Sequence, residues 1–218
     1  MSIYESKWNC EFEKNGLELI HTEVGRKNGR PKNEMIAAGI GAAATKLSLC
    51  RIPNCIKPNM DVLEIGCGPG LNLYALRFTG ANLYGIDVSR KIIDYGAYNV
   101  VPNDIDLIYG DFTKYKFDLS FDIIFEIIVF QHLRLADVQS IFNSVKKNLK
   151  RNGKFIFQML RDTSPRVREW GFTEENRPIP CMRGYTVGEV SDMLEEAGLK
   201  SIDADIVNRD WFVVEATI

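Results

Sequence analysis

Features that mark several common protein classes are missing from this 218-residue sequence. Its five cysteines form no Cys-x-x-Cys pair, and only His21 and His132 can add imidazole ligands, so we expect no metal site. An odd number of cysteines in a sequence without an export signal indicates free thiols rather than disulfides.

Long hydrophobic runs are missing as well. The most apolar stretch, residues 121–130, is interrupted by Asp122 and Glu126 and is too short to cross a bilayer. The first residues show neither a charged segment followed by an apolar run nor a small-residue cleavage site, so we expect no signal peptide. We therefore expect a cytoplasmic protein without a membrane partner.

Charge of one sign is not in excess. The 27 basic and 29 acidic residues give a net charge of -2, which argues against a broad electrostatic grip on nucleic acid. Residues 26–32, Arg-Lys-Asn-Gly-Arg-Pro-Lys, resemble the core of minor-groove DNA hooks. However, Pro31 and Asn33 are also typical turn residues in front of a helix. We expect no nucleic-acid partner.

The pattern of the chain indicates an α/β protein. Its length suits one continuous core, and from residue 62 onward short apolar runs alternate with amphipathic segments, which is typical of βαβ units and a parallel sheet. The runs 203–207 and 211–217 are close enough in sequence to form an antiparallel hairpin. The other expected strands are residues 61–65, 82–87, 105–109, 121–127 and 154–160.

Amphipathic helices are expected between the strands and before the first one. Ser89 and Asn33 are expected as N-caps, whereas Gly153 and Gly198 are expected to follow helix ends. The helical patterns cover residues 33–50, 89–99, 135–149 and 186–197, with another helix from about residue 72.

A glycine-rich segment, Val-Leu-Glu-Ile-Gly-Cys-Gly-Pro-Gly at residues 62–70, joins the first strand to the next helix. Glycine lets the backbone turn sharply and approach a ligand, and the helix that follows presents its N–H groups. The motif alone is weak evidence, because glycine turns also follow strands for structural reasons.

Acidic residues follow the next two strands. Asp87 can accept hydrogen bonds from both hydroxyls of a ribose, and Asp111 precedes Phe112, whose ring can cover an adenine. Each aspartate can also cap a helix or stabilise a turn. Because ligands bind at the carboxyl ends of strands in open α/β sheets, the joint pattern predicts a nucleoside site.

Together with Phe-Asp-Ile-Ile-Phe-Glu (121–126), Gln-His-Leu (131–133) and residues 149–155, these motifs resemble the class I S-adenosylmethionine-dependent methyltransferases. The resemblance implies a three-layer Rossmann-like methyltransferase fold, with a mostly parallel seven-stranded sheet closed by an antiparallel C-terminal hairpin. It also implies a single methyltransferase domain. The implied parts are an N-terminal helical cap (1–55), a cofactor-binding core (56–160), a substrate lid (161–185) and a C-terminal helix and hairpin (186–218).

The resemblance implies S-adenosyl-L-methionine as the cofactor and assigns residues to it. Gly66 and Gly68 would contact its methionine part through backbone atoms, and Glu64 would support the glycine loop. Asp87 would bind the ribose, and Val88 would pack on the adenine.

Further roles fall on the third and fourth strand ends. By resemblance, Asp111 and Phe112 would bind the amino edge and the face of the adenine, and Glu126 would lie beside the sulfonium. His132 is a candidate catalytic base because imidazole titrates near neutral pH. A structural role for His132 in the turn to the next helix is the alternative.

Two other functions remain open. A nicotinamide dinucleotide uses a similar site, but its fingerprint has Gly where this chain has Leu71. A noncatalytic protein that binds S-adenosylmethionine is also compatible with the motifs.

The expected acceptor is an O or N atom of a small molecule, because the Asn/Asp-Pro-Pro-Tyr motif of nucleobase amino methyltransferases is missing. Arginines of the lid can bind a carboxylate or phosphate, although nearby acidic residues also fit a solvated surface of mixed charge. These arginines are Arg161, Arg166, Arg168, Arg177 and Arg183.

Overall fold

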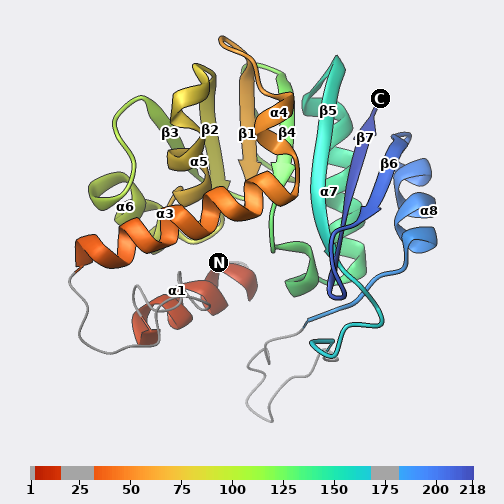
Figure 1. Cartoon of the computed structure of the whole chain (residues 1–218), viewed down its shortest axis with the longest axis horizontal. Coiled ribbons are helices and arrows are strands. Elements are labelled where there is room, and N and C mark those ends of the chain that lie inside the picture. Colours follow the sequence, from red (N-terminus) through yellow and green to blue (C-terminus); the bar gives the residue numbers. More distant parts are fainter. Residues whose placement is uncertain (1–2, 16–31, 168–181) are drawn as a thin grey trace. The chain divides into compact units, whose positions relative to one another are not determined.

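Figure 1 shows the computed structural model of the chain, which describes residues 3–15, 32–167 and 182–218. The chain divides into two compact units, Met1–Lys114 and Tyr115–Ile218. The single domain and its four parts stay a prediction. Several sequence features lie outside the described residues: His21, the Arg-Lys-Asn-Gly-Arg-Pro segment (26–31), Cys181 and the lid residues 168–181 with Arg168 and Arg177.

Seven strands form a mixed sheet in the order β3-β2-β1-β4-β5-β7-β6. In the first unit β1 pairs with β2 and β2 with β3, both in parallel, and in the second unit β4 pairs in parallel with β5. β7 runs antiparallel to both β5 and β6, so the predicted antiparallel C-terminal closure is confirmed. The strands are β1 (Asp61–Ile65), β2 (Asn82–Asp87), β3 (Ile105–Tyr109), β4 (Phe121–Glu126), β5 (Leu149–Leu160), β6 (Lys200–Ile206) and β7 (Trp211–Thr217).

Helices of the first unit pack on one another and on the strands (Figure 1). Ala43 in α3, Leu71 in α5 and Val100 after α6 form a buried cluster. α6 also contacts β2 and β3, and α1 contacts α6. The elements are α1 (Ile3–Asn15), α3 (Lys32–Leu49), α4 (Ile52–Cys55), α5 (Leu71–Leu76), η1 (Arg77–Thr79) and α6 (Arg90–Asn99).

The second unit has an aromatic core. Phe130, Phe142, Phe155 and Phe157 are fully buried, and their rings lie 4.5–6.3 Å apart between centroids. These side chains join the helices to β5, and burying rings of this size is a major source of stability. The helices are η2 (Phe130–His132), α7 (Leu135–Asn148) and α8 (Val187–Ala197).

Several sequence predictions of element boundaries were wrong. β6 begins at Lys200 rather than at residue 203, because Lys200 and Ser201 already pair with Thr217 and Ala216 before a register shift. β5 begins at Leu149 rather than at residue 154, because Leu149 already pairs with Phe121 before a register shift. Gly153 therefore lies inside β5 instead of ending a helix, and a Cβ there would lie 2.9 Å from the carbonyl oxygen of Asp122. α3 begins at Lys32, so Asn33 lies inside this helix instead of capping it.

Other local predictions are confirmed. Ser89 caps α6 by accepting a hydrogen bond from the N–H of Ile92, and Gly198 follows α8 with φ of 70°. None of the cysteines that the structure describes, Cys10, Cys50, Cys55 and Cys67, forms a disulfide.

Within the described parts of the chain, no helix has the length and hydropathy needed to cross a membrane, and no cluster of ligands suits a metal ion. The expected absence of a metal site and of a membrane partner stays a prediction.

Candidate active site

The glycine loop between β1 and α5 is built from residues with left-handed backbone conformations. Gly66, Gly68 and Gly70 have φ values of 68°, 55° and 83°, which side chains with a Cβ rarely adopt. The N–H groups of Gly66 and Cys67 donate to the carbonyl of Ile86 at 2.8 and 3.2 Å. These bonds fix the loop against the end of β2, where Asp87 lies.

Asp87 joins the glycine loop to the start of α6. Its Oδ2 accepts a hydrogen bond from the N–H of Gly68 at 3.0 Å, and its Oδ1 accepts one from the N–H of Ser89 at 2.8 Å. Burial raises the pKa of Asp87, although both N–H groups favour its charged form. A carboxylate has about four acceptor positions, so two remain for other donors, as the two hydroxyls of a ribose require.

Glu64 lies on β1, two residues before Gly66, the first glycine of the loop. Its side chain is 1% exposed, and its Oε1 accepts a hydrogen bond from Nδ2 of Asn72 at 2.5 Å, which ties β1 to α5. The supporting role that the family resemblance implies for Glu64 stays a prediction. Burial, followed by the charges of Asp87 and Glu64, raises the pKa of the Cys67 thiol well above its usual value, so the thiol beside the loop stays protonated.

The loop after β3 is arranged as a turn. Asp111 accepts hydrogen bonds from the N–H and the hydroxyl of Thr113 at 3.0 and 2.7 Å, and it forms an ion pair with Lys114 at 2.7 Å. Burial raises the pKa of Asp111, but these bonds outweigh it and the net pKa is lowered. Phe112 is buried and Val88 is half-buried. The adenine-binding roles of Asp111, Phe112 and Val88 stay predictions.

Two residues of α1 contact this edge of the first unit, and no sequence motif pointed to them. The hydroxyl of Tyr109, at the end of β3, donates to Glu5 at 2.6 Å, and the hydroxyl of Ser89 donates to Oδ1 of Asn9 at 2.7 Å. The contacts span 104 and 80 residues in sequence, so no local pattern predicts them.

In the second unit, Glu126 ends β4 and stabilises the turn that follows. It is fully buried, and its Oε1 accepts hydrogen bonds from the N–H groups of Val129 and Phe130. Burial raises the pKa of Glu126 to about 8, although these N–H groups favour its charged form. Ile128 in the same turn has φ of 64°, an unusual value for a β-branched residue. His132 ends η2 and is half-buried.

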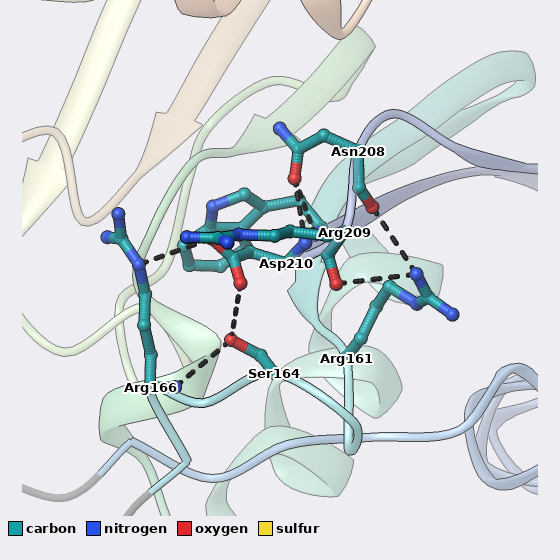
Figure 2. A network of polar contacts seen from close by, with 7 residues as sticks. Arg161, Ser164, Arg166, Asn208, Arg209 and Asp210 are labelled. Atoms are coloured by element: carbon teal, nitrogen blue, oxygen red, sulfur yellow. Dashed lines mark hydrogen bonds and ion pairs between the residues drawn. The ribbon is translucent and has the colours of Figure 1, made fainter.

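Two arginines of the predicted lid, Arg161 and Arg166, contact other residues of the second unit near the carboxyl end of β5. Figure 2 shows Ser164 and Arg166 converging on Asp210. Oγ of Ser164 donates to Oδ1 of Asp210 at 2.8 Å, and Nε of Arg166 forms an ion pair with Oδ2 at 3.4 Å. Arg161 points toward the carbonyl oxygens of Asn208 and Arg209, with the shorter distance 3.3 Å. These contacts join the start of the lid to the loop between β6 and β7.

Comparison with known proteins shows what the central part of the chain is similar to. Residues 63–157 match the family model described as a methyltransferase domain, and this range contains most of β1, the glycine loop, Asp87, Asp111 and Glu126. The match covers less than half of the chain, so this segment is similar to a methyltransferase domain. The similarity favours S-adenosyl-L-methionine over the nicotinamide alternative as the cofactor.

The curated relatives of this chain are named as methyltransferases for different atoms. The ubiquinone biosynthesis O-methyltransferase of Bartonella tribocorum is 30% identical over 131 residues, which cover 58% of this chain and 51% of the relative. A sterol 24-C-methyltransferase of Gibberella zeae is 29% identical over 106 residues, 46% of this chain and 27% of the relative. The matches thus span about half or less of these relatives.

A solved structure shows the same fold. The magnesium protoporphyrin IX methyltransferase of Synechocystis PCC 6803, crystallised with S-adenosylhomocysteine, superposes with a TM-score of 0.68 at 16% identity and covers 97% of this chain and 98% of its own. The predicted Rossmann-like methyltransferase fold is therefore confirmed.

Proposed function

We propose that this methyltransferase moves the methyl group of S-adenosylmethionine to an O or N atom of a small-molecule acceptor. The observation that carries the proposal is the joint arrangement of the glycine loop and Asp87. Oδ2 of Asp87 binds the loop through the N–H of Gly68, while the carboxylate keeps acceptor positions for a ribose.

The protein residues bind and orient the cofactor in this proposal. Gly66 and Gly68 contact the methionine part through backbone atoms, and Glu64 keeps the loop in place through Asn72. Asp87 binds the ribose and Val88 packs on the adenine. Asp111 and Phe112 bind the adenine in this proposal, and Glu126 lies beside the sulfonium.

The bound cofactor supplies a methyl carbon that its positive sulfonium already activates for in-line displacement. Most of the rate enhancement then comes from aligning the acceptor atom and excluding water. A base is required only for a hydroxyl or a protonated amine, and His132 is the proposed base because it follows the fourth strand. A cytoplasmic location of the protein stays a prediction.

Calorimetric titration with S-adenosylmethionine, S-adenosylhomocysteine and NAD tests the cofactor site. The wild type is expected to bind the first two, and Asp87→Ala is expected to weaken both by roughly tenfold or more, since it removes charge-assisted hydrogen bonds. Asp106→Ala is the matched control, because Asp106 lies exposed on β3. Binding of NAD alone would contradict the proposal.

Turnover tests the acceptor and the base. Incubation with methyl-labelled cofactor and a panel of hydroxyl and amine metabolites is expected to give a labelled product. His132→Ala is expected to lower kcat for a hydroxyl acceptor and to flatten its pH profile near neutrality. Full turnover of His132→Ala would leave His132 a structural role, and cofactor binding without any labelled product would favour a noncatalytic protein.

A further inference from the structure

A cluster of buried polar groups lies in the second unit, at the turn after β4. Gln131 is fully buried, and neither its Oε1 nor its Nε2 has a hydrogen-bond partner. The backbone N–H of Arg183 donates to the backbone carbonyl of Gln131 at 2.8 Å, so the two residues are neighbours. Nε of Arg183 is buried without a partner as well.

This arrangement is costly for the folded protein. A buried donor or acceptor without a partner costs about 1–3 kcal/mol, and native structures contain few such groups. Ile128, three residues before Gln131, adds backbone strain with its φ of 64°. Unpaired polar groups and strain in one turn are typical of a place where a ligand completes the bonding.

The side chain of Arg183 is held in a defined orientation. Its Nη2 contacts Oε1 of Glu189 at 3.1 Å, and Oε2 of Glu189 accepts the N–H of Thr186 at 3.0 Å as part of the capping box of α8. The guanidinium also lies 5.1 Å from the ring centroid of Tyr185, which is fully buried. The contact with Glu189 thus involves Nη2 of the guanidinium, whereas Nε is buried without a partner.

Arg183 differs from the other lid arginines that the structure describes. Arg161 faces backbone carbonyls and Arg166 pairs with Asp210, whereas Arg183 has a buried N–H without an acceptor. We propose that Gln131 and Arg183 form a subsite for a carboxylate group of the methyl acceptor. The inference rests on the proposed methyltransferase function and names the chemistry of its substrate.

The donors of the subsite match a carboxylate. Nε–H of Arg183 and Nε2–H of Gln131 donate to its two oxygens, and hydrogen bonds between charged partners are about twice as strong as neutral ones. Oε1 of Gln131 accepts from a hydroxyl or amino group of the same molecule. Two acidic residues belong to the surroundings: Glu189 is paired with Arg183, and Glu126 accepts the N–H of Phe130, the residue before Gln131. Glu126 is mostly uncharged at neutral pH because burial raises its pKa to about 8.

Both donors are visible by proton–nitrogen NMR, so the full chain with S-adenosylhomocysteine is titrated with acetate and benzoate. Acetamide and benzyl alcohol are the neutral comparisons. The carboxylates are expected to shift the Nε–H signal of Arg183 and the side-chain amide signals of Gln131 in a saturable way. Arg183→Gln is expected to weaken carboxylate binding by roughly tenfold or more, and Arg183→Lys by less. Arg151→Gln, at an exposed position, is the matched control and keeps full binding.

Gln131→Met provides a variant that folds without the unpaired amide. Because it buries no unpaired polar atom, it is expected to raise the melting temperature while it loses carboxylate binding. Unchanged signals, equal shifts by acetamide, or wild-type binding by Arg183→Gln would overturn the subsite. If S-adenosylhomocysteine does not bind, the proposed function fails, and the same titration without it still decides the subsite.

Discussion

At the scale of single residues, the protonation of Glu126 makes the stability of the folded protein depend on pH. Its pKa is about 8 in the folded protein and 4.5 ordinarily, so the folded state binds a proton more tightly than the unfolded state. The contribution of this group to stability is therefore complete below pH 4.5 and is lost as pH rises toward about 8.

Glu126→Gln mimics the protonated side chain and keeps the oxygen that accepts from Val129 and Phe130. We expect the variant to match the wild type at acidic pH and to be more stable than the wild type near pH 8. Urea unfolding across this range measures the difference. A difference between the two proteins that does not change with pH would show that Glu126 titrates normally.

Ile128 offers a second prediction at this scale. Gly normally destabilises a strand or helix relative to Ala, but at φ of 64° Ala keeps the strain that Gly relieves. Ile128→Gly is thus expected to be about 1 kcal/mol more stable than Ile128→Ala. The same pair of changes at Val213, within β7, should show the opposite order in denaturant unfolding; the same order at both positions would contradict strain at Ile128.

At the scale of elements, α6 lies close to the glycine loop. A Cβ on Gly96 in α6 would lie 2.6 Å from the carbonyl oxygen of Pro69, a backbone atom of the loop. Gly96→Ala is expected to cost about 1–3 kcal/mol of stability through overpacking and to weaken S-adenosylmethionine binding.

Gly41 in α3 is the control for this change, because nothing lies within 4 Å of a Cβ there. Gly41→Ala is expected to stabilise the protein by about 0.8–1 kcal/mol, the usual helix preference, without altering cofactor affinity. Thermal unfolding and calorimetry of both variants provide the comparison, and equal effects at the two positions would argue against tight packing at Pro69.

Strand and helix positions were largely predictable from the sequence, because apolar runs and caps are local signals. β1, β2, β3 and β7 have the predicted bounds, and Ser89 caps α6 as expected. The start of β5 was not predictable, since the pairing of Leu149 with Phe121 and the close packing of Gly153 are tertiary contacts. A basic turn followed by Gly looks like a helix end when its partner strand is unknown.

At the scale of the whole molecule, the sequence predicts candidate cofactor residues from topology, and their roles stay predictions. Asp87 was identified because parallel strands end at one edge of a sheet, which is a rule of topology. Glu5 and Asn9 were missed, because their contacts join segments distant in sequence. Arg183 was named as a candidate for binding a carboxylate and Gln131 as part of a motif, but only the structure reveals their unpaired buried atoms and the hydrogen bond that joins them.

Cofactor binding should therefore be visible as a stability change of the molecule. A ligand that binds only the folded state at about 100 times its Kd stabilises it by about 2.7 kcal/mol. S-adenosylhomocysteine at that concentration is expected to raise the free energy of unfolding of the wild type by this amount. At the same concentration Asp87→Ala should gain much less stability, because a tenfold weaker Kd removes about 1.4 kcal/mol of the effect. Equal stabilisation of both proteins would place the ligand away from Asp87.

Amide exchange provides a second measurement of the same binding. Since Asp87 and the glycine loop share hydrogen bonds, the ligand should slow amide exchange at Gly68 and Ser89.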